Sequence, residues 1–86
     1  MRPKLATGVR LHWDKVRERH VLLYPEGALA LNPTAVAVLE LCDGERTLDD
    51  VSAILSERYD GADVSADVAE LLAAIEAKGL VVDADA

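Results

Sequence analysis

The sequence predicts an α+β domain in which a three-stranded antiparallel meander precedes three helices. Up to about residue 31 apolar and polar residues alternate, which is the period of a half-buried strand. From Asn32 onward the apolar residues recur at intervals of three and four, as they do in an amphipathic helix. The chain has 86 residues, which is the size of one domain. Strands followed by helices in so short a chain favour helices packed on one face of the sheet.

Turn residues separate the expected strands. Residues 14–19 are polar except for one valine and predict a hairpin loop, in which Asp14 pairs with Arg19 and Trp13 faces His20. Pro25-Glu26-Gly27 predicts a second turn, because proline fixes φ and glycine tolerates a positive φ. The three predicted strands are residues 8–14, 20–24 and 28–31.

Capping residues separate the expected helices. Asn32-Pro33 predicts the start of the first helix, and Asp43-Gly44 its end. Thr47 with Asp50 resembles a capping box for the second, which Asp60-Gly61 ends. The third runs from about residues 63–65 to Gly79, with Val81 and Val82 as a short strand after it. We expect one domain, residues 1–86, with an aliphatic core and with residues 1–7 and 83–86 flexible.

Composition excludes several classes of protein. No apolar run approaches the ~20 residues of a membrane span, and no signal-peptide pattern follows the N-terminus. One cysteine cannot form an internal disulfide, which fits the cytoplasm. A net charge of −7 argues against nucleic acid as a partner. The charge is uneven, because residues 1–24 hold six basic and two acidic side chains while residues 25–86 hold three basic and fourteen acidic ones.

The sequence contains no set of residues that predicts catalysis, a metal site or a cofactor. His12 and His20 are expected on opposite faces of the hairpin, too few and too far apart for a metal. Cys42 is expected at a helix C-terminus beside Asp43, where the thiol is unreactive. The acidic residues around Asp63 lack the spacing of a calcium loop.

One edge of the expected sheet is unprotected. The third strand, Ala28-Leu29-Ala30-Leu31, has no charge, proline or bulge signal, whereas the first strand carries several charges. Either the helices cover this edge, or it accepts an extended peptide as an added strand. The third helix lies beside it in this interpretation and offers apolar residues for a groove. The candidate peptide-binding residues are therefore Ala28, Leu29, Ala30, Leu31, Val68, Leu71, Leu72 and Ile75.

Several segments resemble the PqqD family of pyrroloquinoline quinone (PQQ) biosynthesis. The resemblance covers about residues 2–82 and is carried by Arg2-Pro3-Lys4-Leu5, Gly8-Val9-Arg10-Leu11-His12-Trp13-Asp14, Val21-Leu22-Leu23-Tyr24-Pro25-Glu26-Gly27 and Leu41-Cys42-Asp43-Gly44-Glu45-Arg46-Thr47. It implies a winged-helix-like fold and a peptide chaperone that is not an enzyme. Such proteins are expected to bind a ribosomally made precursor peptide and to present it to a radical S-adenosylmethionine enzyme, which crosslinks a Glu and a Tyr. Related recognition domains add the leader peptide beside the third strand, against the third helix.

Three other hypotheses stay open. The basic N-terminal segment, with Arg2, Lys4, Arg10, Lys15, Arg17 and Arg19, would serve as a docking surface for an acidic patch of the modifying enzyme or of another protein. A winged-helix nucleic-acid binder would need a basic recognition helix, but the second and third helices carry only Arg58 and Lys78. The open edge would also allow a symmetric homodimer, and the sequence does not decide whether one forms.

Overall fold

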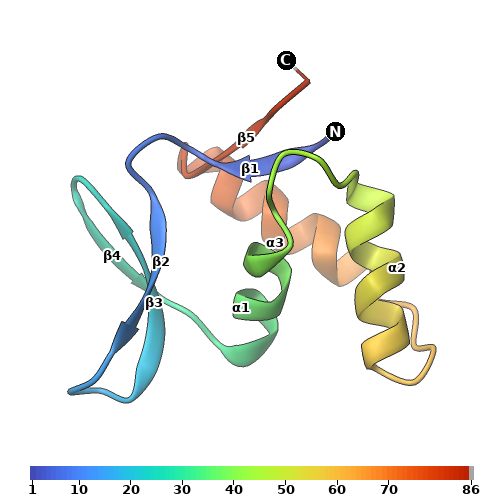
Figure 1. Cartoon of the computed structure of the whole chain (residues 1–86), viewed down its shortest axis with the longest axis horizontal. Helices are drawn as coiled ribbons and strands as arrows, with labels where there is room; N and C mark the ends of the chain where they lie inside the picture. The colour runs from blue at the N-terminus through green and yellow to red at the C-terminus, as the bar shows by residue number, and fades with distance from the viewer. Residues whose placement is uncertain (86) are drawn as a thin grey trace.

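The computed structural model describes residues 1–85 and has the predicted α+β architecture (Figure 1). A three-stranded antiparallel sheet of order β2–β3–β4 lies beside three helices, and a separate two-stranded sheet joins β1 to β5. The elements are β1 (Pro3–Leu5), β2 (Arg10–Asp14), β3 (Arg19–Tyr24), β4 (Gly27–Ala30), α1 (Pro33–Glu40), α2 (Leu48–Arg58), α3 (Ser65–Ala77) and β5 (Val81–Asp83).

The meander has the predicted register. Asp14 pairs with Arg19, and Trp13 lies opposite His20 with their ring centroids 5.0 Å apart in an edge-to-face arrangement. On the same face Leu22 is fully buried opposite Leu29. Because side chains alternate between the two faces of a strand, this face carries the apolar residues toward the helices.

The first two helices begin at the predicted caps. Asn32 Oδ1 accepts a hydrogen bond from the N–H of Ala35 (2.8 Å). Thr47 and Asp50 form a reciprocal capping box, in which Thr47 Oγ1 accepts from the Asp50 N–H (3.1 Å) and Asp50 Oδ2 accepts from the Thr47 N–H (2.9 Å). These bonds satisfy amides that have no partner within the helix, so each cap stabilises its helix by about 1 kcal/mol.

The turn between α1 and α2 joins the helices to the N-terminal strand. Asp43 Oδ1 accepts hydrogen bonds from the N–H groups of Glu45 (2.9 Å) and Arg46 (3.1 Å), and these bonds lower the pKa of the Asp43 carboxyl. Gly44 adopts φ +83° as predicted, and its N–H donates to the carbonyl of Pro3 (3.0 Å). The positive φ expected at Gly27 is wrong, because Gly27 is not among the residues with left-handed backbone.

The terminal segments, which we expected to be flexible, form the two-stranded sheet. Pro3 pairs with Asp83 and Leu5 with Val81, and Pro3 is buried. The backbone N–H of Arg2 also donates to Asp83 Oδ1 (3.1 Å). Three residues are too few to show a periodicity, so β1 had no signal of its own. The prediction for Ala86 lies outside the described residues.

The core is aliphatic, as the near absence of aromatic residues predicted. It joins the inner face of the sheet to all three helices and to β5, so the helices hold the meander from one side only. Its most deeply buried side chains are Leu22, Val38, Leu39, Val51, Leu55, Val68, Leu72 and Val81.

Candidate functional site

Strand β4 is an open edge of the meander. Within residues 1–85 it pairs with β3 on one side and with no strand on the other. The backbone N–H of Leu31, just past the strand, donates to the carbonyl of His20 (3.1 Å). Since backbone groups of successive residues in an antiparallel strand point to opposite sides, Leu29 also bonds toward β3. The N–H and C=O groups of Ala28 and Ala30 therefore point outward from the sheet.

The side chains of the edge alternate between the two faces of the sheet. Leu31 is buried and Leu29 is half-buried, and both belong to the helix-facing side of the sheet. Ala28 and Ala30 are exposed on the other face. The edge thus has small exposed side chains and two free amide–carbonyl sets, a combination that allows another extended chain to approach closely.

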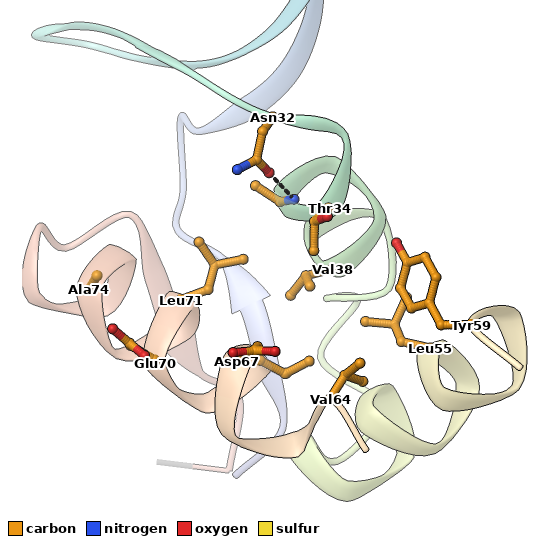
Figure 2. Close-up of a pocket in the computed structure, with 12 residues that line it drawn as sticks. Asn32, Thr34, Val38, Leu55, Tyr59, Val64, Asp67, Glu70, Leu71 and Ala74 are labelled. Atoms are coloured by element: carbon orange, nitrogen blue, oxygen red, sulfur yellow. Dashed lines mark hydrogen bonds between the residues drawn. The ribbon is translucent and has the colours of Figure 1, made fainter. Parts of the chain in front are cut away.

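An apolar groove of about 380 Å³ opens where β4 leads into α1 (Figure 2). Asn32, two residues after the end of β4, stands at its upper end, and Leu71 points from α3 into the hollow across from Val38 of α1. Leu55 and Tyr59 close the side next to α2. The full lining is Asn32, Thr34, Ala35, Val38, Leu55, Tyr59, Val64, Asp67, Val68, Glu70, Leu71 and Ala74.

The four residues predicted on α3 divide into two groups. Leu71 is half-buried and Val68 lies at the floor, and both line the groove. Leu72 and Ile75 are only 2% and 3% exposed and belong to the core, so the structure places them behind the groove and not in its lining. At 100° per residue, Leu72 and Ile75 lie with Val68 on the core-facing side of the helix.

The flank of α3 next to the core-facing side was missed. Asp67, Glu70 and Ala74 lie with Leu71 on this flank and line the groove. Tyr59, which is 41% exposed, comes from the C-terminal cap of α2. The sequence signal for Tyr59 was that it is one of only three aromatic residues in the chain. Its neighbours could not be predicted, because they depend on how α2 packs on α3.

Within residues 1–85 the structure shows no cluster of three or more potential metal-ligating side chains. Cys42 is buried, its Sγ donates to the carbonyl of Val38 (3.3 Å), and burial followed by the charge of Asp43 raises the pKa of the thiol to about 11. A thiol that holds its proton at neutral pH is a poor nucleophile. No helix in this part of the chain has the length and apolarity to cross a bilayer.

A second groove separates the β2–β3 hairpin from α1. It encloses about 740 Å³, and its walls include Trp13, His20 and Arg19 of the hairpin and Val36 of α1. Trp13, the only tryptophan in the chain, is 47% exposed. The two grooves lie on opposite sides of α1, because Thr34, Ala35 and Val38 line the first and Pro33, Val36, Ala37 and Glu40 line the second. Asn32, at the start of the helix, lines both.

The fold and its open edge define a class of protein: a small α+β domain whose meander ends in an unpaired strand beside an apolar groove. The family model described as "Coenzyme PQQ synthesis protein D (PqqD)" matches residues 19–81. The chain belongs to the PqqD family, as the resemblance predicted.

Relatives and solved structures agree with this assignment. The chain is 42% identical over 69 residues to the "PqqA binding protein" of Methylococcus capsulatus, which covers 80% of this chain and 74% of the relative. It is 45% identical over 78 residues to the "Bifunctional coenzyme PQQ synthesis protein C/D" of Methylorubrum extorquens, covering 88% of this chain but 21% of that longer protein.

Two experimental structures share the fold. The solution NMR structure of the PqqD truncation of Methylobacterium extorquens PqqCD, described as a stand-alone recognition element for ribosomally synthesized and post-translationally modified peptides, superposes with a TM-score of 0.79 at 41% identity, covering 93% of this chain and 87% of that one. The crystal structure of PqqD from Xanthomonas campestris superposes with a TM-score of 0.61 at 33% identity, covering 88% and 87%.

Proposed function

We propose that this protein is a peptide chaperone of PQQ biosynthesis that binds the precursor peptide PqqA as an added strand on β4. In this proposal it works in the cytoplasm, catalyses no reaction itself, and presents the peptide to a radical S-adenosylmethionine enzyme. The observation that carries the proposal is the open edge, on which Ala28 and Ala30 offer outward N–H and C=O groups. Relatives that are named PqqA binding proteins support the choice of peptide.

Strand addition fits the chemistry of this edge. Main-chain hydrogen bonds give affinity for any extended segment, and side-chain pockets at alternate positions give selectivity. Ala28 and Ala30 make the main-chain contacts, while Leu71 and Val68 line the groove at the Asn32 end. Leu72 and Ile75 support this flank from the core. A dissociation constant of about 0.1–10 μM, or roughly −8 to −9.5 kcal/mol, would allow both capture and release.

The β2–β3 hairpin provides a separate surface for the modifying enzyme. It carries Arg10, Lys15, Arg17 and Arg19 in a chain of net charge −7, next to the exposed Trp13. Exposed aromatic and arginine side chains are frequent anchors of protein interfaces. Because β2 lies at the opposite edge of the sheet from β4, the peptide and the enzyme would be bound at the same time.

An amide NMR titration with synthetic PqqA of Methylococcus capsulatus tests the peptide site. We expect the largest shifts at Ala28, Ala30 and Asn32 and along the Leu71 flank of α3. Shifts confined to β2, or spread evenly over the chain, would overturn the proposed site. Sedimentation of the free protein is the companion measurement, because a homodimer paired through β4 would dissociate as the peptide binds.

Salt dependence tests the enzyme surface. Exposed charge pairs are screened by salt, so affinity for the radical enzyme should fall steeply between 50 and 500 mM salt, conditions over which the Debye length shortens by about threefold. Replacing Lys15 and Arg19 by glutamine should remove most of this dependence, whereas the same change at Lys78 on the far end of α3 should not. An affinity that is flat in salt would overturn the hairpin as the docking surface.

A further inference from the structure

The groove between α1 and α3 is apolar on its walls and acidic at its edge. Asp67 and Glu70 lie about one turn apart on the exposed flank of α3, between the labelled Val64 and Ala74 and beside the apolar Leu71 (Figure 2). No lysine, arginine or histidine contributes to the lining. The ion pairs found within residues 1–85 join other residues, so neither carboxylate has a cationic partner there.

This combination matches one kind of side chain. Lysine and arginine lay their aliphatic stems along apolar surface and keep the charged head near water or an anion. A purely aliphatic side chain would fill the walls but leave the carboxylates without a partner. An acidic side chain would be repelled by both carboxylates.

We propose that the groove is a selectivity pocket for a lysine or arginine of the bound peptide, with the stem against Leu71 and Val64 and the head at Asp67 and Glu70. The occupant is the residue that lies just beyond the β4-paired segment, because Asn32 connects the end of that strand to the groove. The inference rests on the proposed strand addition and adds to it a charge requirement that main-chain pairing does not have.

The charge distribution of the domain supports this occupant. Residues 25–86, which form β4 and the whole groove, hold fourteen acidic and three basic side chains. Such a surface attracts the cationic part of an extended peptide during its approach and repels an acidic part. The groove therefore sets which stretch of the precursor is captured, and an acidic stretch is left free for the enzyme.

Calorimetric titration of synthetic PqqA from Methylococcus capsulatus tests the pocket. The variants are Asp67→Asn, Glu70→Gln and their combination, and the matched control is Glu76→Gln, an exposed acid on the same helix outside the groove. At 50 mM salt we expect the double variant to bind about tenfold more weakly and the control to bind as wild type. At 500 mM salt the difference should shrink to about twofold, because exposed pairs are screened.

Peptides in which each Lys or Arg is replaced in turn by norleucine identify the occupant, since norleucine keeps the stem and removes the charge. One such peptide should lose about tenfold affinity for the wild type and lose nothing further for the Asp67→Asn/Glu70→Gln variant. If no replacement couples to these two positions, or if the double variant binds as wild type, the pocket is overturned.

The variant Ala30→Pro separates this failure from a failure of the proposed function. Weak binding by Ala30→Pro with wild-type binding by the double variant would leave strand addition standing and remove the charge requirement. Wild-type binding by a folded Ala30→Pro variant would count against strand addition itself, while the coupling measurement would still report on the groove.

Discussion

The backbone N–H of Leu31 donates to the carbonyl of His20, and this hydrogen bond determines which way the amides of β4 point. With Leu31 bonded inward, the alternation of an antiparallel ladder turns Leu29 inward and Ala28 and Ala30 outward. The two alanines are the residues whose main chain is free, and their small side chains leave room for a partner strand.

Replacing Ala30 by proline should weaken peptide binding about tenfold without unfolding the domain. The change removes an outward N–H, worth about 1 kcal/mol, and adds a ring at the edge. Ala30→Val is the control, because it keeps the N–H and suits a strand. Calorimetry gives the affinities and circular dichroism the fold; equal losses in both variants would point to the side chain and away from the main chain.

Leu71 and Leu72 are neighbours in sequence with different roles. Leu72 is 2% exposed in the core, so Leu72→Ala should lower the free energy of unfolding by about 2–5 kcal/mol. Leu71 is half-buried in the groove, so Leu71→Ala should cost about 1 kcal/mol of stability and should also weaken peptide binding several-fold. Urea denaturation and peptide titration of both variants check this, and a stable Leu71→Ala variant with unchanged affinity would contradict it.

Alanine substitutions at Gly44 and Gly61 distinguish the cost of backbone strain from the cost of steric contact, because both glycines have φ +83°. A Cβ on Gly44 would lie 3.2 Å from Lys4 Cδ and 3.3 Å from Ala84 Cβ, whereas one on Gly61 would meet nothing within 4 Å. Gly61→Ala should therefore cost about 1–2 kcal/mol from the left-handed backbone alone. Gly44→Ala should cost about 1 kcal/mol more and should speed amide exchange at Lys4 as the terminal strands loosen. Equal losses of stability in the two variants would refute the contact with these strands.

The Cys42 thiol should make the stability of the folded protein fall at alkaline pH. Its pKa in the folded protein is raised from 9.0 to about 11, so the folded state favours the protonated thiol. The contribution of this pKa shift to the free energy of unfolding is fully present below pH 9 and is lost as the pH rises from 9 to 11. Denaturation of wild type and Cys42→Ala across this range should show an alkaline loss in wild type that the variant lacks. Iodoacetamide labelling at pH 8 should be slow until urea unfolds the chain, and rapid labelling of the folded protein would contradict this.

Local patterns predicted most of the fold. The alternation of Leu11, His12 and Trp13 and the turn at Pro25 predicted the meander, and the caps Asn32 and Thr47 predicted where α1 and α2 begin. These signals depend on residues a few positions apart, so the sequence carries them directly. Strand β1 had no such signal, because Pro3 and Leu5 form a strand only through Val81–Asp83 at the other end of the chain.

The candidate site was partly predictable for the same reason. The residue types at positions 28–31 already marked an edge without charge or proline, and the helical period placed Leu71, Leu72 and Ile75 on one broad face. What divided that face into core and groove was the packing of α3 against α1 and α2, which covers Leu72 and leaves Leu71 and Asp67 at the surface.

By itself, then, the amino-acid sequence determined the order of the meander strands and the helices, the N-caps of α1 and α2 and the uncharged character of the third meander strand, because each depends on neighbours along the chain. The tertiary structure alone decided that the backbone N–H and C=O groups of Ala28 and Ala30 point away from β3, that Asn32 stands at the end of a groove, and that the two terminal segments pair. These features come from contacts between segments far apart in the sequence, where hydrogen-bond register and side-chain packing are set by the whole fold.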